Sequence, residues 1–144
     1  MNLKTLTYWT CTAVIAFIFL SSGIFYMMGV PATVEGIVRL GYPLYFVTLL
    51  GAWKVLGGLA ILVPGFARVK EWAYAGMFID LTSAAVSNSA TGLAWWHVVA
   101  PLSVALVLVA SWALRPQSRT LGTLFPAMTG RTVGVHFSAQ LSRA

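Results

Sequence analysis

Four long apolar stretches dominate the pattern of hydrophobic and polar positions along the 144-residue chain. They cover residues 8–28, 45–63, 72–90 and 95–114. Each is long enough to cross a bilayer as a helix, which takes about 17 to 25 residues. None alternates polar with apolar residues as the strands of a membrane barrel do. The pattern therefore predicts an all-α, polytopic membrane protein folded as a four-helix bundle.

The segments between these stretches are short. Residues 29–44 leave room for one short helix on the membrane surface, and residues 64–71 form a tight basic turn. From Arg115 onward the chain has four arginines and no acid, and no helical apolar period. We expect residues 1–115 to form the transmembrane domain and residues 116–144 a flexible, basic cytoplasmic tail.

Composition and charge support a membrane location and set an orientation. Hydrophobic residues make up 59% of the chain and charged residues 8%, whereas about a quarter of a soluble domain is charged. Basic residues favour the cytoplasmic side. Seven of the nine fall on one side: Lys4, Arg68, Lys70, Arg115, Arg119, Arg131 and Arg143. Both termini are therefore predicted to be cytoplasmic, in a bacterial inner membrane. We interpret the net charge of +6 as a result of this topology and expect no nucleic-acid partner, since nothing else in the sequence supports one.

The first stretch has an alternative interpretation as a secretory signal peptide. Lys4 precedes it, and the small residues Ser21, Ser22 and Gly23 lie within it. The apolar run continues to Met28, which is too long for the core of a typical signal. We interpret it as an uncleaved membrane helix.

Two charges lie in the middle of these apolar runs. Lys54 is ten residues before Pro64 and Asp80 is eight residues after Trp72, on the two sides of the same basic turn. At about 1.5 Å per helical residue, both lie roughly 12 to 15 Å deep, near the centre of the bilayer. An acid and a base at matched depth are expected to form an ion pair, and charges within membrane helices commonly mark a functional site.

Small residues share the helix faces of both charges. Gly51 and Gly58 lie on one stripe with Lys54, while Ala73, Gly76, Ser83 and Ser87 lie on one with Asp80. Small residues let membrane helices approach closely, so both charges are predicted to point into the bundle. Ser22 and Tyr26 could add hydroxyl groups from the first helix. The candidate polar site comprises Lys54, Asp80, Ser83, Ser87, Tyr26 and Ser22.

Such a site could bind a polar head group or carry a proton, but no residue can be assigned a catalytic role. We expect a ligand-binding or accessory subunit. A stand-alone membrane enzyme or transporter that uses the same pair is the alternative, and a scaffold in which the pair only fixes helix register is another. The lone Cys11 cannot form a disulfide within the chain, and His97 and His136 are expected on opposite sides. No metal, haem or nucleotide motif is present in the sequence.

The sequence also resembles a known family. The matching positions include Gly41-Tyr42-Pro43, Leu50-Gly51, Lys54, Leu56-Gly57, Ala60, Pro64, Arg68, the run Lys70-Glu71-Trp72-Ala73-Tyr74-Ala75-Gly76, Pro101-Leu102 and Ser111. They closely resemble the DoxX-like family of small membrane proteins, over roughly residues 7–115. Asn88 stands where many members have a histidine, and Asp80 where many have an uncharged polar residue.

The resemblance implies a four-helix membrane bundle and directs attention to Tyr42, Arg68, Glu71, Trp72 and Asn88. Because the family is named after a subunit associated with a quinone-reducing, thiosulfate-oxidising complex, it also points to quinone or thiol redox processes. A quinone is the ligand class that it suggests. The expected partners are the lipid bilayer and either a membrane redox enzyme or further copies of the chain. For Glu71 itself, we expect a helix-capping role with a local bridge to Arg68 or Lys70.

Overall fold

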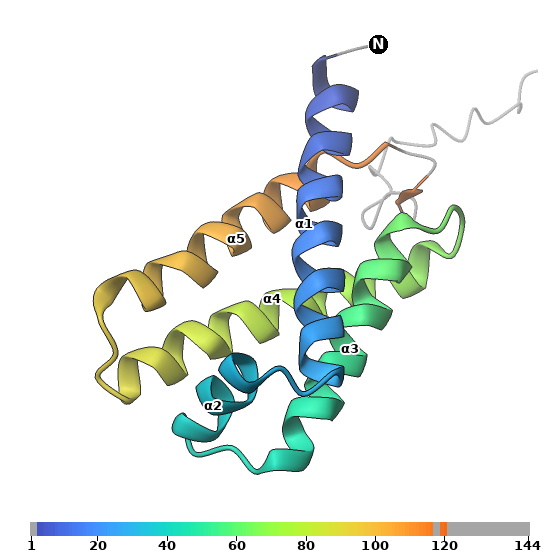
Figure 1. The fold of residues 1–144 in the computed structure, drawn as a ribbon. Helices are drawn as coiled ribbons and strands as arrows, with labels where there is room; N and C mark the ends of the chain where they lie inside the picture. Colours follow the sequence, from blue (N-terminus) through green and yellow to red (C-terminus); the bar gives the residue numbers. More distant parts are fainter. Residues whose placement is uncertain (1–2, 117–118, 121–144) are drawn as a thin grey trace, which may run out of the picture.

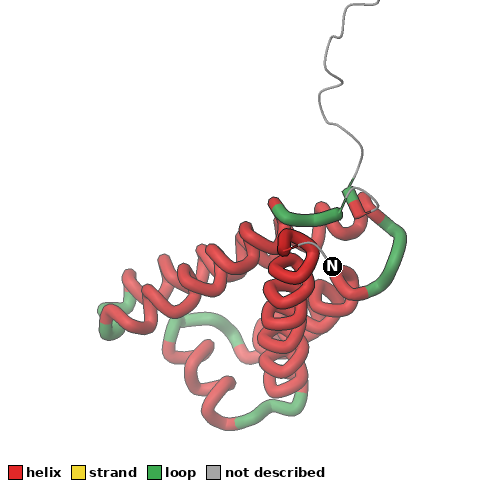
Figure 2. Tube along the Cα trace, turned by 90° about the horizontal axis from the view of Figure 1, so that it is seen from above, coloured by secondary structure: helices red, strands yellow, loops and turns green. Residues whose placement is uncertain are grey.

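The computed structural model describes residues 3–116 and 119–120, and all its regular elements are helices (Figures 1 and 2). The helices are α1 (Leu3–Met27), α2 (Pro31–Arg39), α3 (Leu44–Leu62), α4 (Ala67–Ala90) and α5 (Trp95–Ala113). The all-α prediction is confirmed for this part of the chain. Apart from Pro116, Arg119 and Thr120, the expected basic tail lies outside the described residues.

Three helices end in the same kind of turn, among them α2, where Gly41 has a φ of 89° and the Tyr42 N–H donates to the carbonyl of Ile37. After α1, Gly29 has a φ of 66° and the Val30 N–H donates to the carbonyl of Phe25. After α4, Gly92 has a φ of 67° and the Leu93 N–H donates to the carbonyl of Asn88. These are Schellman turns, in which glycine takes the left-handed conformation without a Cβ clash.

Of the helices that the structure describes, three are long and apolar enough to cross a membrane, namely α1, α3 and α5. The fourth expected span, residues 72–90, lies in α4, which has 24 residues but is less apolar. Asp80 and the hydroxyl and amide side chains that follow it lower its hydropathy. Even so, α4 exposes Phe78, Ile79 and Val86 on its outward surface, as the other long helices expose large apolar side chains.

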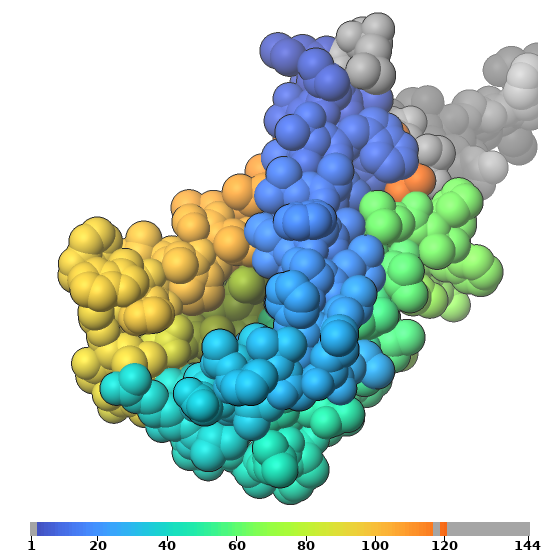
Figure 3. Space-filling model, viewed as in Figure 1, coloured from blue at the N-terminus to red at the C-terminus, as the bar shows by residue number. Residues whose placement is uncertain are grey.

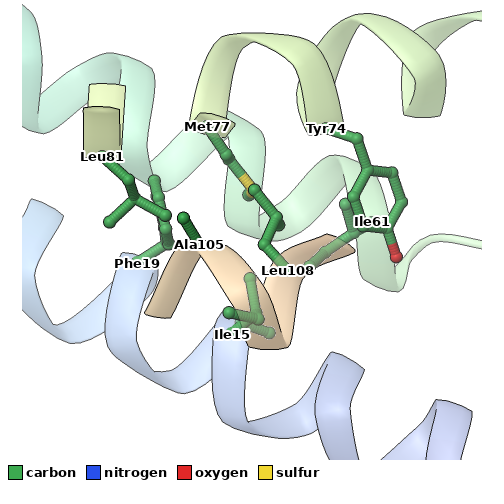
Figure 4. Packing of buried hydrophobic residues seen from close by; sticks show 9 residues of the cluster. Ile15, Phe19, Ile61, Tyr74, Met77, Leu81, Ala105 and Leu108 are labelled. Atoms are coloured by element: carbon green, nitrogen blue, oxygen red, sulfur yellow. The ribbon is translucent and has the colours of Figure 1, made fainter. Parts of the chain in front are cut away.

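The long helices pack in a closed cycle. The most extensive pairings are α1 with α3 and α4 with α5, and α1 also contacts α5 as α3 contacts α4. The core lies where these pairs meet (Figure 4) and consists of Ile15, Ala16, Phe19, Ile61, Tyr74, Met77, Leu81, Ala105 and Leu108. In Figure 1, α3 and α4 meet at the loop that joins them and diverge away from it, with α2 near the open end.

Candidate functional site

A groove with a volume of about 540 Å³ lies between α3 and α4. Its α3 wall includes Leu49, Trp53 and Lys54, and its α4 wall includes Gly76 and Asp80. The lining is mostly apolar, and the rim carries large exposed side chains: Trp53 is 65% exposed, Trp72 82% and Ile79 62%. The groove therefore opens on an apolar surface of the molecule. Its volume is typical of small-molecule sites, which span about 300 to 1,000 Å³.

Lys54 and Asp80 meet on the wall of this groove. The Lys54 Nζ lies 2.5 Å from Asp80 Oδ2, and the two side chains are 12% and 17% exposed. The ammonium group also lies 4.7 Å from the ring centroid of Phe19 and 5.7 Å from that of Tyr26. Two aromatic faces and a carboxylate thus surround the cation. The expected ion pair is present, and it faces a cavity.

The small residues of α3 place Lys54 by bringing α3 against α1. A Cβ built on Gly51 would lie 2.8 Å from the carbonyl oxygen of Gly23, and one built on Gly58 would lie 2.9 Å from Leu20 Cγ. Only glycine allows such a close helix contact. The predicted close approach is confirmed for α3, with α1 as its partner.

The small residues of α4 face open space in the groove and are not packed against another helix as those of α3 are. Ala73, Gly76, Ser83 and Ser87 line the groove together with Asp80. A Cβ built on Gly76 would meet no atom within 4 Å. The expectation that this stripe packs closely against another helix is wrong at Gly76, because α3 and α4 diverge there.

The other members of the predicted polar site are placed differently. Ser83 and Ser87 line the groove, and the Ser87 Oγ lies 2.9 Å from the Tyr42 hydroxyl. This bond ties the α2–α3 connection to α4 across the groove. Tyr26 lies beside Lys54 but lines a neighbouring cavity. Ser22 donates to the Phe19 carbonyl of its own helix and lines neither cavity.

Glu71 pairs with the end of α5 and not with its own loop. Its carboxylate accepts hydrogen bonds from Trp112 Nε1 at 2.9 Å and from an Arg115 NH2 group at 2.7 Å. Burial raises the pKa of Glu71, but these two bonds and the Arg115 charge outweigh it and hold the pKa below its ordinary value. The expected bridge to Arg68 or Lys70 is wrong, since a contact 44 residues away replaces it.

Lys70 instead caps α3. Its side chain is fully buried, and its Nζ donates to the carbonyls of Ala60, at 2.9 Å, and Val63. A cation at the C-terminal end of a helix satisfies carbonyls that have no partner within the helix. Burial and the nearby Arg119 and Arg115 charges lower the pKa of Lys70. Arg68 is exposed and makes no ion pair with any residue that the structure describes.

Asn88 has a structural partner. Its Nδ2 donates to the carbonyl oxygen of His97 at 2.7 Å. In a regular helix that carbonyl would accept from the N–H of residue 101, which is Pro101 and has none. Asn88 therefore replaces a hydrogen bond that α5 lacks. Such a replacement matters most in a membrane, where water is scarce.

The sequence analysis did not predict a buried hydroxyl network that Thr12, Tyr74 and Ser111 form away from the groove. The Ser111 Oγ lies 2.8 Å from both the Thr12 Oγ1 and the Tyr74 hydroxyl, and Thr12 and Ser111 are fully buried. No local spacing predicts it, because Thr12 and Ser111 lie 99 positions apart in the chain. The network links α1, α4 and α5, and it does not line the groove.

The groove combines hydrogen-bonding groups with apolar walls. The described residues contain no group of three His, Cys, Asp or Glu side chains that could hold a metal ion. Lys54 can donate hydrogen bonds and Asp80 can accept them, beside the apolar walls of the groove. This combination fits a small polar head with an apolar body.

Comparisons with known proteins bear on the fold. A model of the DoxX-like family matches residues 10–111, a segment that contains α2, α3 and α4 completely and most of α1 and α5. Neither the curated proteins nor the solved structures gave a match. The match covers well over half of the chain, including the groove and its ion pair, and the chain therefore belongs to the DoxX-like family.

Proposed function

We propose that this chain crosses a bacterial inner membrane four times, with α4 as the fourth span and both termini in the cytoplasm, and binds a neutral amphipathic molecule in the groove. The contacts of α4 with α5 and α3 support its placement as a span, as do its exposed Phe78 and Val86. Its one acid within residues 72–90, Asp80, is paired. The proposal makes the chain a four-helix bundle with α2 at its surface.

The ion pair limits the chemistry of the head group. Lys54 and Asp80 together carry no net charge, so a charged head would leave an uncompensated charge in an apolar site. A neutral head with a carbonyl can accept from Lys54, and one with a hydroxyl can donate to Asp80. A quinone and its quinol offer these two groups. The apolar walls would hold an attached hydrocarbon tail.

One observation carries this proposal, namely that the ion pair lies on the wall of a large groove. A pair that only fixes helix register would be enclosed by packing. Here the preceding turn of α4 presents Gly76, whose missing side chain keeps the groove wide beside Asp80. A binding or accessory subunit that presents its ligand to a membrane redox enzyme, or to another copy of the chain, fits this open site.

Filling the groove without touching its charges tests the proposal. Gly76→Leu would place a side chain into open space, and Leu is a better helix former than Gly. Ala75→Leu adds a comparable side chain at an exposed position that does not line the groove. Each variant and the wild type would be purified in mild detergent, and the bound lipids would be extracted and identified by mass spectrometry.

We expect wild type and Ala75→Leu to retain the same amphiphile, and Gly76→Leu and the double variant Lys54→Met, Asp80→Asn to lose it. Retention by all variants would refute a site in the groove. Turnover of the retained molecule by the purified chain alone would favour the stand-alone enzyme or transporter. A wild type that retains nothing would favour a scaffold.

A further inference from the structure

A second cavity lies at the α2 end, next to the groove. It has a volume of about 270 Å³ and is lined from α1, α2, α4 and α5 and from the loop between α4 and α5. Figure 3 shows α4 at the floor of a hollow bounded by α1, α2 and α5. Its polar lining residues are Tyr26, Arg39, Asn88 and His97. At roughly 30 Å³ per water molecule, it has room for several waters with polar partners.

The two cavities share a wall. Ile37, Leu40 and Ala84 line both of them. Tyr26 lines the second cavity, while its ring centroid lies only 5.7 Å from the Lys54 Nζ on the groove side. The polar cavity thus reaches within one aromatic ring of the ion pair.

The charge of the second cavity differs from that of the groove. Among the described residues its lining contains one cation, Arg39, and no carboxylate. Arg39 is the last residue of α2, and His97 lies in the first turn of α5, so both belong to helix ends near the expected membrane surface. Side chains of this kind keep water in a cavity, whereas the groove walls exclude it.

We propose that this second cavity is an aqueous entrance through which water and protons reach Lys54 and Asp80 from the α2 end, with the Tyr26 ring as the last barrier. The inference rests on the membrane placement given under the proposed function, but not on the identity of the ligand. It gives the buried pair access to water on one side of the membrane only.

Cysteine accessibility tests the entrance. Cys11 is the only cysteine, so a Cys11→Ser chain provides the background. Into it we would introduce His97→Cys at the rim, Ala84→Cys in the shared wall and, as a control, Leu106→Cys. Leu106 is 72% exposed on α5 and lines neither cavity. Sealed vesicles would be treated with a membrane-impermeant cationic thiol reagent before and after permeabilisation.

We expect Ala84→Cys to react from the same side as His97→Cys. Its rate should exceed that of Leu106→Cys by on the order of tenfold or more, because a thiol in apolar surroundings is less often ionised. Slow reaction of both Ala84→Cys and Leu106→Cys would overturn the entrance alone. Fast reaction of Leu106→Cys would instead show that α5 does not face lipid, and the proposed membrane placement would fail.

A second pair of variants tests the barrier. Ser83 is exposed and lines the groove but not the second cavity. Adding Tyr26→Ala to Ser83→Cys should raise its labelling rate from the α2 side by about tenfold. An unchanged rate at His97→Cys in the same background would show that the fold is intact. An unchanged rate at Ser83→Cys would overturn the role of Tyr26 as the barrier.

Discussion

Gly51→Ala is expected to separate the two helices that hold Lys54 in place. Gly51 on α3 faces Gly23 on α1, and a methyl group at Gly51 would lie 2.8 Å from the Gly23 carbonyl oxygen and 2.9 Å from Tyr26 Cβ. The reverse contact is equally short, since a Cβ on Gly23 would lie 2.8 Å from the Gly51 carbonyl oxygen. The Gly23 oxygen belongs to the backbone and the Tyr26 Cβ is attached to it directly, so rotation of a flexible side chain relieves neither contact of the new methyl group.

The loss of stability depends on how far α1 and α3 must move apart to accommodate the methyl group. Non-bonded carbon atoms are most stable at about 3.5 to 4.0 Å, and a gap of 0.5 to 1 Å forfeits roughly a quarter to a half of the dispersion energy of the atoms it separates. Overpacking of this kind destabilises by about 1 to 3 kcal/mol. Alanine recovers about 1 kcal/mol through its higher helix propensity. The net loss for Gly51→Ala is therefore up to about 2 kcal/mol.

Gly76→Ala is the matched control. A Cβ at Gly76 meets nothing within 4 Å, so this variant gains the propensity of alanine without a clash. The difference in unfolding free energy between Gly76→Ala and Gly51→Ala then isolates the packing term of about 1 to 3 kcal/mol. Thermal unfolding in detergent, followed by the fluorescence of the six tryptophans, measures it. Melting temperatures should differ by roughly 2 to 8 °C per kcal/mol.

Equal melting temperatures for the two variants would refute the close contact between α1 and α3. A second readout follows from the site, because a Cβ on Gly23 would lie 3.0 Å from Lys54 Cβ. A shift of α1 relative to α3 therefore moves Lys54 relative to Asp80. We expect Gly51→Ala to weaken retention of the groove ligand as well, and Gly76→Ala, with only one added methyl group, to weaken it less than Gly76→Leu.

Lys54→Met alone should lower the melting temperature more than the Lys54→Met, Asp80→Asn double variant, because the single change leaves a carboxylate without its cation; equal values would contradict the ion pair. Asn88→Ala should cost about 1 to 3 kcal/mol in the natural chain and much less beside Pro101→Ala, which restores an N–H for the same carbonyl. Additive losses in that double-mutant cycle would refute the pairing. Since the pKa of Glu71 is held below its ordinary value of 4.5, its contact should stabilise the fold above that pH and be lost as the pH falls through the lowered pKa. Glu71→Gln should lack this acid-dependent loss, and parallel melting profiles for it and the wild type would contradict the shift.

Features that depend on position along one helix could be predicted from the sequence. Counting residues from the turn that joins their helices places Lys54 and Asp80 opposite each other, and the two side chains do meet. The short helix between the first two long stretches was likewise predictable from loop length, and α2 occupies it. In both cases the geometry of a single helix, or of two helices joined by a short turn, determines where the residues lie.

Features that depend on which helices pack together could not be predicted in this way. Glu71 pairs with Arg115 because the start of α4 lies beside the end of α5, a relation that local spacing does not contain. The hydroxyl contact between Thr12 and Ser111 joins residues 99 positions apart. The same stripe of small residues marks a close contact on α3 and an open wall on α4, because the outcome depends on the facing helix.

The open wall on α4 has an energetic consequence. Apolar atoms that line an unfilled space lose their contacts on one side, and this loss grows with the size of the space. In a bilayer something must therefore fill the groove. A plain acyl chain would pack against the apolar walls. It could not form hydrogen bonds with Lys54 and Asp80, which bond to each other but have further donor and acceptor positions. A molecule with a neutral polar head and an apolar tail can contact both the ion pair and the apolar walls, so it should displace acyl chains from the groove. Gly76→Leu should abolish this preference, because the added side chain removes the space.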